Sequence, residues 1–231
     1  MSGSQRPAPR AVDRTRRRTG RPVLGLDLAG VPHRSTGWCV LYDGRDARTG
    51  VAHSDEEIEA LAAKVHPALV IIDAPLSLPV GRRTIEDRSG PHLRACDHEL
   101  LRRHIRFFPL TLGPMRGLTV RGMRLAERLR RTGSEVVEGY PGASQDLLGI
   151  PRKGVGLVPL ARGLRRLGIR GDLVRGGLTH DELDAVTIAW VGHEHLRGRS
   201  LVIGDVREGE MVLPLPGDGV RRKAPADRRP P

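Results

Sequence analysis

The hydrophobic and polar positions along the chain alternate between short apolar runs and amphipathic stretches. Residues 23–29, VLGLDLA, and residues 68–75, ALVIIDAP, are near-continuous apolar runs of strand length, which is typical of strands buried on both faces. Residues 35–44 and 45–53 read as two further strands joined at an Asp-Gly turn. The first three strands lie close together in the sequence and therefore predict an antiparallel meander.

The other periodic segments predict helices. Residues 54–67 begin with Ser54 and Glu57 in the spacing of a capping box and end at Pro67. Further amphipathic helices are predicted over residues 93–105, 115–133, 157–169 and 178–198. We also expect a long loop over 76–92, a strand and turn over 134–143, and a closing hairpin over 200–215.

This order predicts an α/β fold whose sheet combines an antiparallel three-strand meander with parallel strands, flanked by helices. An RNase H-like sheet has this order, with its first and fourth strands adjacent at the centre. In that arrangement Asp27 and Asp73, which interrupt the two apolar runs, would lie side by side.

Charge divides the 231 residues into a body and two tails. The formal charge is +12, but residues 1–22 hold seven arginines against one acid, and residues 217–231 hold five basic residues against two acids. These Pro/Arg/Gly-rich tails have the composition of disordered segments. We therefore expect one domain over residues 23–216, with a nearly neutral charge, between tails that could bind phosphate non-specifically.

Composition excludes several classes of protein. Aromatic residues make up 3% of the chain, which argues against an open stacking platform for single-stranded nucleic acid. No apolar run approaches the roughly 20 residues of a membrane span. Cys39 and Cys96 fit no C-x-x-C metal pattern and indicate no disulfide framework, so we expect a reducing cytoplasm. The oligomeric state stays undefined.

Five acidic residues are candidates for catalysis. Asp27 and Asp73 stand in apolar strands, where an unpaired carboxylate is costly, and Asp184 stands on a strongly apolar helix. Asp181 shares a helix face with Asp184, and Glu138 lies near a strand end. Converging carboxylates are the ligands that Mg²⁺ or Mn²⁺ prefers in phosphoryl chemistry. We expect Asp27, Asp73 and Asp184 to bind the metal, with Asp181 or Glu138 completing the site.

Four of these acids, all except Asp184, also have a structural explanation. Backbone amides could satisfy Asp27, Asp73 could cap a turn, the helix dipole would favour Asp181, and Glu138 could face water. A second group of charged residues comprises Arg94, Asp97, Arg103 and Lys153. This group could form a clamp for substrate phosphate beside the long loop. Alternatively, its members on the helix at 93–105 form a salt-bridged face in water.

The ordered motifs GLDLAG, IIDAPLSLP, RACDHELLRR, VVEGYPGA, GIPRK, DELDAVTIAW and EGEMVLP together resemble the family called domain of unknown function 429. The resemblance spans residues 23–214 and implies a nuclease of RNase H-like fold, with Asp27 and Asp73 among its metal-binding acids. DELDA resembles the last-helix acidic motif of the junction resolvases, which would place Asp184, and with it Asp181, in the site.

These features predict a nuclease that depends on Mg²⁺ or Mn²⁺ and acts on a nucleic acid or a nucleotide. One alternative is a nucleotide hydrolase or phosphotransferase, because GLDLAG also resembles the first phosphate motif of the actin and sugar-kinase ATPases. The other is a non-catalytic module that binds nucleic acid through its basic tails.

Overall fold

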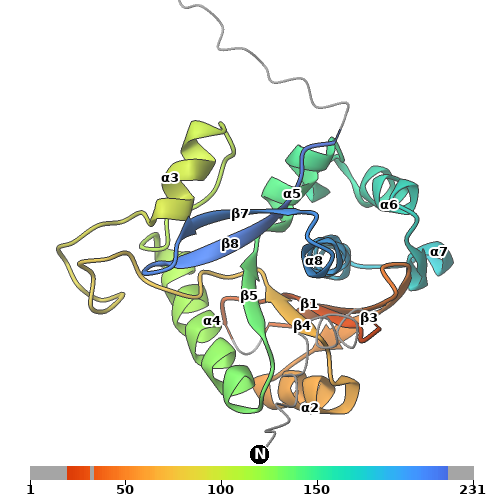
Figure 1. Cartoon of the computed structure of the whole chain (residues 1–231), viewed down its shortest axis with the longest axis horizontal. Coiled ribbons are helices and arrows are strands. Elements are labelled where there is room, and N and C mark those ends of the chain that lie inside the picture. The colour runs from red at the N-terminus through yellow and green to blue at the C-terminus, as the bar shows by residue number, and fades with distance from the viewer. Residues whose placement is uncertain (1–19, 32–33, 218–231) are drawn as a thin grey trace, which may run out of the picture.

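A mixed eight-stranded sheet forms the centre of the protein in a computed structural model, which describes residues 20–31 and 34–217 (Figure 1). The strand order is β6-β3-β2-β1-β4-β5-β8-β7. The strands are β1 (Val23–Asp27), β2 (Thr36–Tyr42), β3 (Asp46–Ala52), β4 (Leu69–Ile72), β5 (Val136–Gly139), β6 (Arg170–Gly171), β7 (Ser200–Asp205) and β8 (Gly209–Pro214). The predicted tails lie almost wholly outside the described residues.

The helices are α2 (Asp55–Val65), α3 (Ala95–Arg102), α4 (Gly113–Arg131), α5 (Pro141–Leu148), α6 (Leu157–Arg166), α7 (Asp172–Arg175) and α8 (His180–Leu196), with a 3₁₀ turn, η1 (Lys153–Val155). In the described part of the chain, no helix is long and apolar enough to cross a membrane. Ser54 and Thr179 cap α2 and α8, each accepting a hydrogen bond from a backbone N–H three residues on.

The central strands pair as their sequence patterns predict. β1, β2 and β3 form the antiparallel meander, β4 lies parallel to β1, and β5 lies parallel to β4. The first and fourth strands are therefore adjacent, and β4 is buried along its whole length. The hairpin predicted over 200–215 also forms, and its strand β8 pairs with β5 in parallel.

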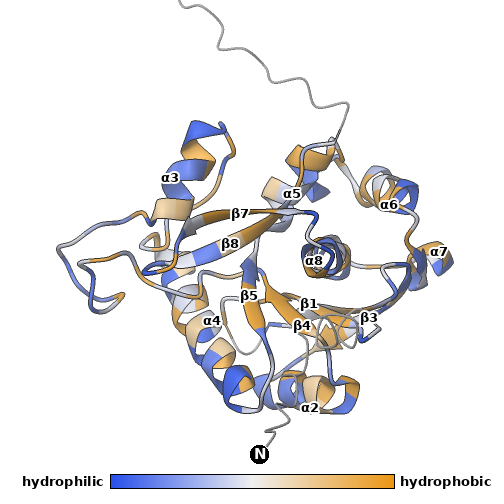
Figure 2. Ribbon diagram, in the orientation of Figure 1, coloured by the Kyte–Doolittle hydropathy of each residue, from blue (hydrophilic) through white to orange (hydrophobic). Residues whose placement is uncertain are grey.

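Helices cover both faces of the sheet because side chains alternate along the central strands. Val23 and Ile71 pack against α6 and α8 on one face, whereas Leu24 and Ile72 pack against α2 and α4 on the other. A third apolar cluster joins α3 and α5 to the hairpin (Figures 1 and 2). Because β1, β4 and β5 are parallel, their carboxyl ends lie at the same edge of the sheet, and the candidate site described below lies at this edge.

Some elements were not predicted. α5 begins at Pro141, and Pro is common at the first position of a helix. Because Gly142 follows directly, the Pro-Gly pair predicts a turn instead. The short β6 and α7 carry too few residues to show a period. The long loop, by contrast, contains no helix or strand, and the buried Arg82 donates hydrogen bonds to its carbonyls at Asp87, Gly90 and Pro91.

Candidate functional site

Asp27 and Asp73 occupy neighbouring ends of the two central parallel strands. Asp27 is the last residue of β1, and Asp73 directly follows β4. The backbone N–H of Asp73 donates to the carbonyl of Leu26 at 2.9 Å, which continues the pairing by one residue. The structure therefore places the two aspartates side by side, as the strand order predicts.

Two glycines let α8 lie directly on the sheet beside these aspartates. A Cβ atom added to Gly25 would come within 2.4 Å of a carbonyl oxygen of α8, and one added to Gly37 would come within 2.3 Å of the Asp181 carbonyl carbon. Gly37 is also the cross-strand partner of Asp27. This close approach brings Asp181 and Asp184, near the start of α8, to the edge of the sheet where β1 ends.

Asp184 is 3% exposed and has two side-chain partners. The Gln145 Nε2 atom on α5 donates to Asp184 Oδ1 at 2.7 Å. The Lys153 Nζ atom on η1 lies 2.7 Å from Asp184 Oδ2 and 3.9 Å from Asp27 Oδ2. The ammonium group of Lys153 thus occupies the position of a cation between two carboxylates that come from different elements.

Burial and neighbouring carboxylates raise the pKa values of Asp27 and Asp73. Burial raises the pKa of Asp27, and the neighbouring carboxylates of Asp73 and Asp184 raise it further. Burial and then Asp184 raise the pKa of Asp73 to about 7, against the opposing effects of Lys153 and a hydrogen bond with Asp27. Burial lowers the pKa of Lys153, but Asp184 and Asp27 outweigh it, so the net shift is upward. A nearby positive charge therefore favours the ionised forms of Asp27 and Asp73.

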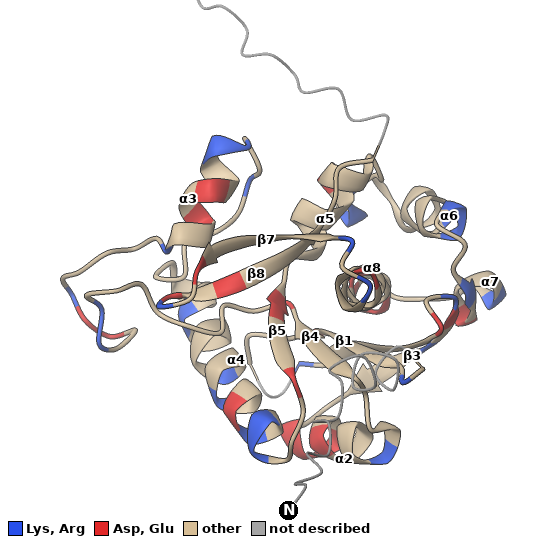
Figure 3. Cartoon of the chain, viewed as in Figure 1, with Lys and Arg blue, Asp and Glu red and all other residues tan. Residues whose placement is uncertain are grey.

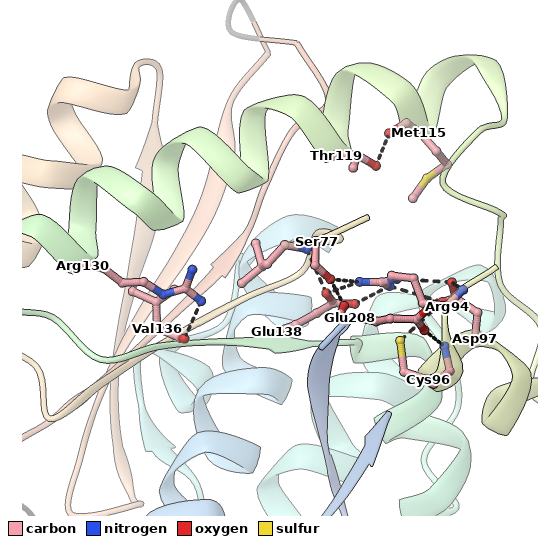
Figure 4. Close-up of polar contacts among 12 residues, drawn as sticks. Ser77, Arg94, Cys96, Asp97, Met115, Thr119, Arg130, Val136, Glu138 and Glu208 are labelled. Atoms are coloured by element: carbon pink, nitrogen blue, oxygen red, sulfur yellow. Dashed lines mark hydrogen bonds and ion pairs between the residues drawn. The ribbon is translucent and has the colours of Figure 1, made fainter. Parts of the chain in front are cut away.

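Glu138 lies beside Asp73 in the sheet but is engaged by another residue. It pairs with Ile72 of β4, and Arg94 Nη1 and Nη2 donate to its two carboxylate oxygens at 2.7 and 2.8 Å. Arg94 also donates to Asp97, which accepts from the Arg94 backbone N–H as well (Figure 4). Arg94 is 2% exposed. The predicted alternative of a solvated, salt-bridged face is therefore wrong for Arg94 and Asp97, which form a buried network.

Arg103 has the exposed setting that this alternative describes. It pairs with Glu99 at 2.8 Å, and Arg102 pairs with the same carboxylate. Figure 3 shows basic and acidic positions together along α3. Arg103 is not among the residues that line the cavities beside the carboxylate cluster. The structure thus does not bring Arg103 together with the other predicted site residues.

Two hollows open on either side of the carboxylate cluster. A cavity of about 410 Å³ has Asp73, Asp184 and Lys153 at its polar end. Its remaining wall is largely apolar and includes Phe107, Phe108, Leu110, Met115, Leu118 and Tyr140. A second, more polar hollow of about 380 Å³ is lined by Asp27, Asp181, Arg34 and Lys153. Lys153 borders both, so the cluster forms the boundary between them.

A family model described as "Protein of unknown function (DUF429)" matches residues 25–154, more than half of the chain. The chain belongs to this family. The matched part of this DUF429 protein contains Asp27, Asp73, Glu138 and Lys153, whereas α8, with Asp181 and Asp184, follows it. No curated protein matches the chain.

The donor set of this DUF429 protein fits a hard divalent cation, because it consists of carboxylate oxygens. Among the described residues, however, no three His, Cys, Asp or Glu side chains already converge closely enough to hold a metal ion. Lys153 occupies the space between Asp27 and Asp184 instead. Since the lysine side chain is 47% exposed and lies on a short 3₁₀ turn, its ammonium has room to withdraw toward solvent.

Sequence reasoning missed two residues that build the site. Gln145 was not recognised as a site residue because its helix, α5, was not predicted. Arg121 on α4 is buried and holds the chain after β1, donating to the carbonyl of Ala29 at 2.6 Å and to Asp55 at 2.9 Å. A single arginine on a helix rich in arginines carries no signal that distinguishes it from its exposed neighbours.

Proposed function

We propose that this DUF429 protein is a divalent-metal-dependent phosphodiester hydrolase, a nuclease of RNase H-like architecture. The observation that carries the proposal is the clustering of Asp27, Asp73 and Asp184 at the ends of the central strands. Burial and neighbouring carboxylates raise the pKa values of Asp27 and Asp73, and Lys153 lies between Asp27 and Asp184. Groups whose ionisation is disfavoured by both burial and like charges are typical of functional sites.

The arrangement of strands supports the RNase H-like assignment. The antiparallel meander β1-β2-β3 continues into the parallel strands β4 and β5, and the final long helix α8 crosses the meander and β1. Fold alone does not define activity, so the argument for hydrolysis depends on the carboxylates and not on the architecture.

Asp27, Asp73 and Asp184 are the residues that would hold Mg²⁺ or Mn²⁺, with Asp181 beside them in the polar hollow. When bound, such a cation supplies charge stabilisation to a phosphoryl group and activates water. Gln145 orients Asp184 through its hydrogen bond, and the half-exposed ammonium of Lys153, which borders both hollows, would attract the substrate phosphate.

We assign the Glu138–Arg94–Asp97 network to positioning. Glu138 Oε2 also accepts from the backbone N–H of Leu76 at 2.9 Å, just after the segment that carries Asp73. The network therefore fixes the course of the chain behind Asp73. Neither Glu138 nor Arg94 has a free charged atom to offer a metal or a phosphate.

Hydrolysis of short DNA and RNA strands in Mn²⁺ tests the proposal. We expect Asp27→Asn, Asp73→Asn and Asp184→Asn each to lose activity by about 100-fold or more while remaining folded by circular dichroism. Asp205→Asn is the matched control, because Asp205 is a partly exposed partner of Arg207 and lies far from the cluster in the strand order. Full activity in Asp27→Asn, or no cleavage of any strand by the wild type, would overturn the proposal.

A further inference from the structure

The apolar cavity beside the carboxylates concentrates aromatic side chains. The whole chain contains two Phe, two Tyr and two Trp residues, and three of these six, Phe107, Phe108 and Tyr140, line this one cavity. Nothing in the core requires this placement for Phe108, which is 68% exposed. An exposed aromatic ring at the rim of a cavity indicates a ligand that stacks on it.

The wall that carries these rings is held in place. Tyr140 Oη donates to the backbone carbonyl of Arg106 at 2.6 Å, which fixes the segment bearing Phe107 and Phe108 against the end of β5. The Arg152 guanidinium lies over the Tyr140 ring, 5.9 Å from its centroid. Met115 projects from α4 toward the space above the Arg94–Glu138 pair, on another side of the same cavity (Figure 4).

The polar end of the cavity contains the candidate catalytic groups. Asp73, Asp184 and Lys153 line the same space as the aromatic wall. A ligand that fills the cavity therefore presents one apolar, planar part to the rings and one polar part to the carboxylates. The volume of about 410 Å³ lies in the range of roughly 300–1,000 Å³ that is usual for small-molecule sites, and it cannot admit a base-paired duplex.

We propose that this cavity binds a single unpaired nucleobase of the substrate, next to the phosphate that is cleaved. The position of the cleaved phosphate rests on the proposed function, whereas the binding of the base rests on the cavity alone. Aromatic stacking is tolerant of base identity, so the cavity selects an unpaired nucleotide over a duplex more strongly than one base over another. The nucleotide can be a free small molecule or part of a single strand.

Fluorescence of 2-aminopurine riboside, a nucleoside without phosphate, tests the cavity in buffer that contains EDTA. We expect quenching that saturates with wild-type protein and a dissociation constant about tenfold higher for Phe108→Ala. Leu112→Ala is the matched control, since Leu112 is 46% exposed in the same segment but does not line the cavity. Both side chains are exposed enough for truncation to leave the fold intact.

No saturable quenching with the wild type, or equal binding by Phe108→Ala and the wild type, would overturn the proposal. Oligonucleotides containing 2-aminopurine then distinguish the sources, because tighter binding of the single strand than of the free riboside would identify a strand as the ligand. The same strand in a duplex should not bind. Since the nucleoside arm uses neither metal nor phosphate, its outcome is independent of Asp27→Asn. Failure of the hydrolase proposal and failure of the base site can thus be told apart.

Discussion

The Lys153 ammonium nitrogen lies 2.7 Å from Asp184 Oδ2, and this contact links the only described 3₁₀ turn to the buried carboxylate of α8. The lysine neutralises a cluster whose members otherwise repel one another. It therefore acts as the internal cation of the metal-free protein, and we expect metal binding and the lysine contact to compete.

The first prediction concerns Lys153→Met. Without the ammonium, the carboxylates lose their compensating charge, so the metal-free variant should be less stable by roughly 1 kcal/mol, a value discounted for the half-exposed lysine. Mn²⁺ should stabilise the variant more than the wild type. Thermal unfolding in EDTA and in Mn²⁺ measures both effects, with Lys64→Met at the exposed end of α2 as the control. Equal stabilisation of both proteins by Mn²⁺ would contradict the competition.

The second prediction concerns Asp73 and pH. Its pKa is raised from 3.8 to about 7 in the folded state, so the folded protein binds more protons than the unfolded chain between these values. The contribution of Asp73 to stability therefore falls as pH rises from about 4 to 7. Asp73→Asn removes this loss and should be more stable than the wild type by roughly 1–2 kcal/mol at pH 8 in EDTA.

Urea unfolding at pH 5 and pH 8 measures this difference. The advantage of Asp73→Asn should be larger at pH 8 than at pH 5. A variant that is less stable than the wild type at pH 8 would show that Asp73 is a structural cap and would remove the electrostatic basis for the site.

The third prediction separates the buried arginine from the exposed ones. Arg94→Met leaves Glu138 and Asp97 as uncompensated buried charges and should cost about 3–5 kcal/mol in the free energy of unfolding. Arg102→Met removes an exposed ion pair on the same helix and should cost no more than about 0.5 kcal/mol. Urea denaturation compares the two, and similar costs would contradict a structural role for Arg94.

The fourth prediction concerns the close approach of α8 to the sheet. Gly37→Ala places a Cβ atom into the backbone of Asp181, so α8 must shift away from β2. We expect a loss of roughly 2–3 kcal/mol in stability and weaker binding of Mn²⁺. Gly113→Ala is the control, because nothing lies within 4 Å of its added Cβ atom. If Gly37→Ala behaves like Gly113→Ala, the spacing between α8 and the sheet does not position the acids.

Much of the central sheet could be predicted, because the apolar runs around Asp27 and Asp73 are long enough to mark buried parallel strands. Their side-by-side placement then follows from the strand order. The partners of the charged residues could not be predicted in the same way. Arg94 and Arg103 flank the same helix, α3, nine residues apart, yet one is buried against Glu138 and the other is partly exposed beside Glu99.

This difference arises from tertiary packing. Glu138 comes from β5, and only the pairing of β5 with β4 and β8 brings it under α3. The contact between Lys153 and Asp184 is similarly non-local, since η1 and α8 are brought together by α6, which packs against both. Local patterns contain no information about such distant partners.

Calorimetric titration of Mn²⁺ into the wild type, Asp27→Asn and Asp205→Asn tests the central claim most directly. We expect the wild type and Asp205→Asn to bind one or two ions with similar affinity, and Asp27→Asn to bind at least about tenfold more weakly. Because the titration needs no substrate, it tests the carboxylate cluster alone. Absence of binding to the wild type, or unchanged binding by Asp27→Asn, would contradict the claim that these aspartates form a metal site.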